Sequence, residues 1–209
     1  MTALDKIAYF QNRRDETPNK ELAAELVRNH DLPGIQEIAE NLWNEDDHIQ
    51  KDCLVVLYWV GYQQPELIAQ YAEDFLQLLE SRDNRLVWSG MIALSTVAHL
   101  RADLLYEHID EIRRVMGKGS VITVDNAVKT LAIVASTSPE RRQAIFPELL
   151  DHLATCRAQS VAQHAEHTLV AVDASNREDF VRVLEKRLDD LRGGQVGRVR
   201  RILRKVETL

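Results

Sequence analysis

Four small residues recur at nearly constant intervals through the middle of the 209-residue chain. Cys53, Gly90, Ala127 and Ala165 stand 37, 37 and 38 positions apart, and each is followed by leucine four residues later and by valine seven residues later. Intervals of this length are typical of helical hairpins that stack on their neighbours and bury a continuous core. The spacing therefore predicts an all-α fold, a right-handed α-α superhelix of about six helical hairpins.

Helix start and stop signals fall between the recurring small, leucine and valine positions, which we call the small, leucine and valine columns. Thr17-Pro18, Gln64-Pro65 and Ser138-Pro139 each place proline near a first helical position, and glycines follow several expected helix ends. We expect one domain over 1–209, made of a capping hairpin (1–32), four regular repeats (33–175) and a basic capping hairpin (176–209). The expected helices are 3–14 with 19–30, 33–43 with 46–63, 65–80 with 83–100, 103–116 with 120–136, 139–156 with 160–174, and 176–191 with 195–207.

The second helix of each hairpin has a recognisable pattern. Residues 90–98 (GMIALSTVA) and 127–135 (AVKTLAIVA) resemble the second helix of HEAT and armadillo repeats, and the resemblance covers 33–175. One departure is that Gln50, Val87, Val124 and Ala162 stand where a HEAT repeat usually has arginine. The resemblance implies an α-solenoid whose second helices line a concave surface, and it implies no catalytic residue.

Charge is distributed unevenly along the chain. Residues 1–100 carry 8 Lys/Arg and 17 Asp/Glu, whereas residues 192–209 carry 6 and 1. An acidic body argues against a general nucleic-acid binder, which needs cations along its whole binding surface. No apolar run approaches the roughly 18 residues of a membrane span and no signal peptide is evident, so we predict a cytoplasmic protein with no membrane partner.

One flank of each second helix is expected to face solvent. Positions one before, two after and six after the small residue lie away from the core positions, and by resemblance they face the groove. The predicted binding stripe is Asp52, Val55, Trp59, Ser89, Ile92, Asn126, Lys129, His164, His167, Arg198 and Arg201. Trp59 is either an exposed aromatic anchor or is packed against the N-terminal hairpin, and the sequence leaves both open.

Histidines form the only pattern that suggests a metal. His164 and His167 are three residues apart on one predicted helix, with His152 on the preceding helix. Two imidazoles at this spacing can converge on an ion, but no third ligand is fixed by spacing. We therefore predict no metal and no cofactor, and we expect zinc to leave the melting temperature unchanged.

No catalytic motif is present, and the leading hypothesis is a non-catalytic scaffold that binds a protein or peptide along the concave face. A second hypothesis is an enzyme similar to DNA alkylation-repair glycosylases, for which Asp52 and Trp59 are the candidate residues. A third and weaker hypothesis is a protein similar to the phycobilin-lyase-like HEAT proteins. The basic tail either caps the last repeat or binds an anionic partner, nucleic acid included, through Arg198, Arg200, Arg201, Arg204 and Lys205.

Overall fold

The computed structural model describes residues 2–208, and within that range it contains helices and no strand. The α-helices are α1 (Thr17–Asn29), α2 (Leu32–Glu40), α3 (Asp47–Gln63), α4 (Ala72–Leu78), α5 (Asn84–Val97), α6 (Ala102–Glu107), α7 (Ile109–Lys118), α8 (Val121–Ser136), α9 (Pro139–Thr155), α10 (Ala158–Thr168), α11 (Arg177–Arg187) and α12 (Gly194–Val206). Short 3-10 turns lie at Leu4–Lys6, Asn41–Trp43, Pro65–Leu67, Ala69–Tyr71, Leu169–Ala171 and Leu188–Asp190.

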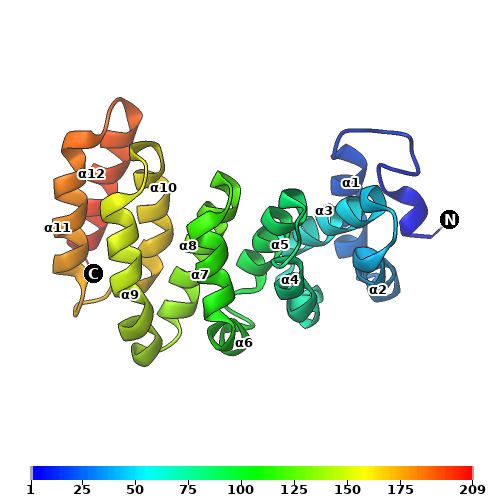
Figure 1. Cartoon of the computed structure of the whole chain (residues 1–209), viewed down its shortest axis with the longest axis horizontal. Helices are drawn as coiled ribbons and strands as arrows, with labels where there is room; N and C mark the ends of the chain where they lie inside the picture. Colours follow the sequence, from blue (N-terminus) through cyan, green and yellow to red (C-terminus); the bar gives the residue numbers. More distant parts are fainter. Residues whose placement is uncertain (1, 209) are drawn as a thin grey trace.

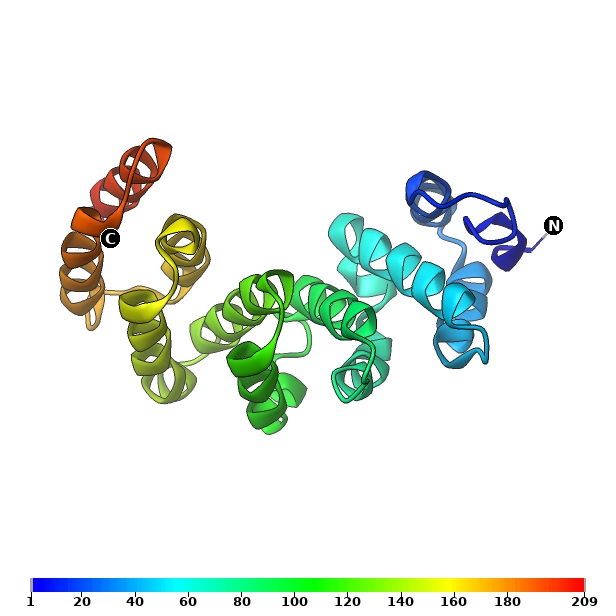
Figure 2. The ribbon, with the colours of Figure 1, turned by 45° about the horizontal axis from the view of Figure 1, so that its top comes forward.

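The helices form two layers along an arc (Figures 1 and 2). Alternate helices α1, α3, α5, α8, α10 and α12, here called the inner helices, each contact the next along the chain. Figure 2 shows them on the concave side of the arc, with the outer helices α2, α4, α6, α7, α9 and α11 behind them. Each unit contacts mainly its neighbours, which is the defining property of a solenoid.

The repeated small residues lie where the layers meet. Cys53, Ala127 and Ala165 are fully buried, and so are Leu57, Leu94 and Leu131 of the leucine column. Gly90 on α5 faces α4 so closely that an added Cβ would lie 3.2 Å from the carbonyl oxygen of Phe75. The repeated small residues therefore set how closely the two layers approach, and the leucines that follow them contribute to the core.

The first predicted helix, 3–14, is wrong. Only Leu4–Lys6 forms a 3-10 turn, and Asn12 has a positive φ of 54°. The backbone amides of Ala8 and Tyr9 instead donate to the side chains of Asn19 and Asp52, each at 2.8 Å. This segment is thus held by polar side chains of α1 and α3 in place of a helical hydrogen-bond ladder.

Other boundaries differ locally. The helix expected from residue 65 begins at Ala72 after two 3-10 turns, and the helix expected over 103–116 is divided into α6 and α7 at His108. Although Pro147 lies within it, α9 runs unbroken from Pro139 to Thr155. Residues 121–124 form the first turn of α8, within the helix expected over 120–136, with Ser120 as its N-cap.

None of the helices among residues 2–208 has the length and apolar character that crossing a bilayer requires.

Candidate functional site

The inner helices leave part of their side chains in contact with solvent. Each of α3, α5, α8 and α10 lies on outer helices and is flanked by two inner neighbours, whereas α1 and α12 at the ends have one inner neighbour each. Along α3, every residue from Cys53 to Tyr58 is buried. Many side chains of these helices remain partly or fully exposed, and we call six of them the inner stripe: Lys20, Trp59, Tyr62, Lys129, His167 and Arg201.

Four residues expected on the exposed flank are buried. Val55 is 0% exposed, His164 1%, Ser89 2% and Ile92 8%. The expectation treated each second helix as having one free flank, but stacking against the neighbouring inner helices covers that flank. These four residues support the packing and do not form a free surface.

Asp52 is engaged in holding the N-terminal segment. One carboxylate oxygen accepts from the backbone amide of Tyr9 at 2.8 Å, and the other accepts from Nδ2 of Asn19 at 2.9 Å. Asp52 lines a depression of about 830 Å³ together with residues of the N-terminal segment, and Trp59 does not line it. The two residues required by the glycosylase hypothesis therefore do not share one cavity.

Trp59 lies at the centre of an aromatic group on α3. Its ring is 5.5 Å from that of Tyr62 and 6.2 Å from that of Tyr58. Lys20 of α1 places its ammonium 4.8 Å from the indole centroid. Trp59 is thus partly covered by α1 and partly exposed. The structure therefore lies between the two alternatives left open by the sequence, an exposed aromatic anchor and a residue packed against the N-terminal hairpin.

Lys129 is an unusual cation within the stripe. Its ammonium lies 5.8 Å from the ring centroid of Tyr62, although α5 separates the two helices that carry them. Burial lowers the pKa of Lys129, and no carboxylate contributes an opposing effect. Lys129 is therefore a half-buried positive charge that lacks an ion-pair partner within residues 2–208.

The histidines form two different environments. His164 Nε2 lies 2.7 Å from Asp125 Oδ1, and His164 Nδ1 lies 2.9 Å from His152 Nε2. His167 takes no part in this chain of contacts. Burial lowers the pKa of His152 to about 4, and burial together with the charge of Lys129 lowers the pKa of His167 to about 4. Both rings are therefore neutral at neutral pH.

These low pKa values predict acid sensitivity. An unfolded histidine titrates near pH 6.5, so between about pH 6.5 and pH 4 the unfolded state binds more protons and the folded state loses stability as the pH falls. We expect the melting temperature to decrease over this interval and His167→Gln to reduce the decrease. His99→Gln, at an exposed position of the same protein, serves as the matched control. An unchanged pH profile in His167→Gln would contradict the prediction.

The basic end is partly neutralised. Arg198 forms a two-point contact with Glu166, with distances of 3.1 Å and 2.5 Å. Arg200, Arg201, Arg204 and Lys205 remain exposed on α12.

Asn126 of the predicted stripe is held by hydrogen bonds, since it donates to the carbonyl of Ile122 and accepts from Ser95. Of the predicted stripe, Trp59, Lys129, His167 and Arg201 stay accessible, whereas sequence reasoning missed Lys20 and Tyr62.

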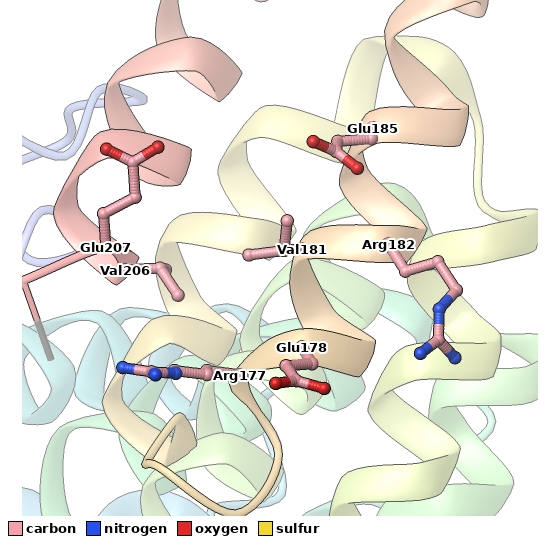
Figure 3. A pocket seen from close by; sticks show the side chains of 7 residues that line it. All are labelled: Arg177, Glu178, Val181, Arg182, Glu185, Val206 and Glu207. Atoms are coloured by element: carbon pink, nitrogen blue, oxygen red, sulfur yellow. The ribbon is translucent and has the colours of Figure 1, made fainter.

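A further cavity of about 470 Å³ lies between α11 and α12. Figure 3 shows Val181 and Val206 at its centre, with Arg177, Glu178 and Glu207 around them. Charges of both signs alternate at its rim, so it has no single electrostatic character. None of the predicted site residues lines it.

Comparisons with known proteins identify the fold. A scan against protein-family models and a search of curated proteins find no match. Among solved structures, an engineered protein from the Northeast Structural Genomics Consortium is similar with a TM-score of 0.65 and 19% identity, covering 100% of this chain and 98% of that one.

Two designed armadillo repeat proteins are similar as well. One, solved in complex with the peptide (KR)4, has a TM-score of 0.67 and 13% identity over 90% of this chain and 86% of its own. The other has a TM-score of 0.65 and 14% identity over 97% and 99%. Identities this low establish the architecture alone, and the chain is an armadillo-like α-solenoid.

Proposed function

We propose that this chain is a non-catalytic scaffold that holds an extended peptide or protein segment along its inner stripe. The observation that carries the proposal is the unpaired, half-buried charge of Lys129 beside the exposed ring of Tyr62. Burying a cation without a partner costs free energy, and an anionic group on a bound segment would offset that cost.

The neighbouring aromatic side chains supply the apolar part of such a contact. Trp59 and Tyr62 lie edge to face at 5.5 Å, and Tyr62 is 48% exposed. Tryptophan and tyrosine commonly dominate the binding energy of interfaces. The stripe thus matches a segment with an acidic residue next to apolar ones.

A similar designed armadillo protein was solved with the basic peptide (KR)4. That likeness supports peptide binding as a use of this architecture. The cations Lys20 and Lys129 on the inner stripe of this chain lead us to expect the opposite ligand charge.

A peptide-display selection on the purified protein, followed by fluorescence anisotropy on the selected peptides, tests the proposal. We expect enrichment of acidic peptides and a Kd that rises about tenfold or more in Lys129→Met, because a desolvated charge pair is lost. Lys186→Met, at an exposed position of α11, is the matched control and should bind as the parent does.

Lys129→Met is not expected to impair folding. Because Lys129 is a half-buried charge without an ion-pair partner, Lys129→Met should melt at the same temperature as the parent or higher. Selected peptides without acidic residues, bound equally by the parent, by Lys129→Met and by Tyr62→Ala, would refute the inner stripe as the binding surface.

Nucleic acid is the other ligand class to test. A gel-shift titration with duplex DNA over increasing salt, comparing the parent with Arg201→Ala and Arg204→Ala, measures any contribution of the basic end of α12. Phosphate contacts give a steep loss of affinity with salt. Binding of that kind, without peptide binding, would favour the second hypothesis over the scaffold.

A further inference from the structure

Three potential metal ligands converge where α8, α9 and α10 meet. His152 is on α9, Cys156 is the C-cap residue of α9, and His164 is on α10. One ligand atom from each of these side chains lies within 4.8 Å of the others. We infer that His152, Cys156 and His164 form a binding site for one divalent transition-metal ion, with Zn²⁺ as the ion that best suits two imidazole nitrogens and one thiolate sulfur.

The hydrogen bonds of His164 leave the correct nitrogen available. Its Nε2 lies 2.7 Å from a carboxylate oxygen of Asp125, and a carboxylate oxygen accepts the ring N–H. The lone pair is then on Nδ1, which points toward His152 at 2.9 Å. A carboxylate that orients a histidine in this way is a common partner of metal-ligating imidazoles.

Metal binding at this position balances in protons and charge. Without metal, Nε2–H of His152 donates to Nδ1 of His164. On binding, His152 changes to its other tautomer without losing a proton, and the Cys156 thiol releases one proton to become the ligand. The two charges of the ion are then matched by the thiolate and by the Asp125 carboxylate.

The movement required of the two imidazoles is small. Metal–nitrogen bonds of about 2.0–2.1 Å in tetrahedral geometry separate two ligand nitrogens by about 3.3 Å, compared with 2.9 Å between His152 Nε2 and His164 Nδ1. Each ring would have to shift by a fraction of an ångström. His152 and Cys156 are four residues apart, so their side chains lie on one face of α9.

The backbone that carries Cys156 is firmly held. The amide of Cys156 donates to the carbonyl of His152 at 2.7 Å, which continues the helical ladder. The buried guanidinium of Arg187 donates to the carbonyls of Leu153 at 2.6 Å and of Cys156 at 2.7 Å. Ligands fixed by such supporting contacts lose little freedom when an ion binds.

The site also has an access route. A cavity of about 280 Å³ is bordered by the three ligands and Asp125, together with Met116, Gly119, Val121, Val124, Arg157 and Ser160. Three protein ligands leave the fourth tetrahedral position for water or a small anion from this cavity. His167 does not belong to the cluster, so the third ligand is a cysteine that the histidine spacing could not indicate.

Cobalt substitution tests the inference directly. The protein, prepared without a polyhistidine tag and stripped with a chelator, is titrated with Co²⁺ and then with Zn²⁺. We expect saturation at one ion per chain, with a thiolate-to-cobalt charge-transfer band and tetrahedral visible bands that Zn²⁺ abolishes. Contrary to the expectation from the histidine spacing alone, Zn²⁺ should also raise the melting temperature, because it binds the folded state.

Variants separate the site from other histidines and thiols. Cys156→Ser should lose the thiolate band, and His152→Gln should lose tetrahedral binding. Asp125→Asn should weaken affinity about 10–100-fold, as loss of an orienting partner does. Cys53→Ala and His99→Gln, each far from the cluster in sequence, should behave as the parent. Circular dichroism of each variant confirms that it is folded.

Two outcomes would overturn the inference. One is the absence of a thiolate band at tenfold excess cobalt in the folded parent, which would leave a hydrogen-bonded cluster only. The other is equal affinity in the parent, Cys156→Ser and His152→Gln, which would place the ion elsewhere.

Discussion

Gly90→Leu is expected to destabilise the protein by about 3 kcal/mol, at the upper end of overpacking costs. The nearest atom to a Cβ at this position is a backbone carbonyl oxygen, that of Phe75 at 3.2 Å, and Leu78 Cβ follows at 3.3 Å. Neither can rotate away, so α4 and α5 would have to separate. Urea unfolding followed by circular dichroism measures the loss.

Gly197 provides the control for this substitution. An added Cβ at Gly197 on α12 meets nothing within 4 Å. Gly197→Ala should therefore raise stability by up to about 1 kcal/mol through helix propensity alone. If Gly90→Leu proves no more harmful than a leucine at Gly197, the proposed close contact between the layers is wrong.

Arg187→Ala is expected to cost about 3 kcal/mol as well, because it leaves the carbonyls of Leu153 and Cys156 without their charged donor in a buried environment. Arg187 is only 8% exposed and joins α11 to the end of α9. Arg187→Lys should recover part of the stability, since one ammonium cannot reproduce the planar fork of a guanidinium.

Arg182 is the matched control on the same helix. It pairs with Asp179 across the surface of α11, with both side chains more than half exposed. Exposed pairs of this kind contribute roughly 0–1 kcal/mol, so Arg182→Ala should change the unfolding midpoint little. Comparable losses in the two variants would show that the buried contacts of Arg187 are not special.

The repeat fold was predictable because a periodic core leaves a periodic sequence. Cys53, Gly90, Ala127 and Ala165 mark the layer contact directly, and Leu57, Leu94 and Leu131 are buried with them, whereas Leu169 is only partly buried. The non-helical N-terminal segment was not predictable, because the amides of Ala8 and Tyr9 bind Asn19 and Asp52, which are distant from them in sequence. Helix propensity depends on local sequence and cannot predict such long-range hydrogen bonds.

The inner stripe was predictable in part. Lys129, His167 and Trp59 follow from the helical register, but the burial of Val55 and Ile92 depends on how closely neighbouring inner helices stack. Sequence spacing gives the angle of a side chain about its own helix and does not give the angle between helices. For the same reason the sequence indicated only a weak metal-binding pair, His164 with His167. In the structure, His164 lies beside His152 and Cys156 instead.

The contact between Tyr62 and Lys129 spans three consecutive inner helices, since α5 lies between α3 and α8. The long side chains of Tyr62 and Lys129 therefore meet over the intervening helix. This contact, at 5.8 Å from ammonium to ring centroid, joins α3 and α8 across the solvent-facing side of the layer. An acidic segment bound as proposed would draw Lys129 away from Tyr62, so occupation of the inner stripe would exchange a contact between two helices of the solenoid for a contact with the ligand.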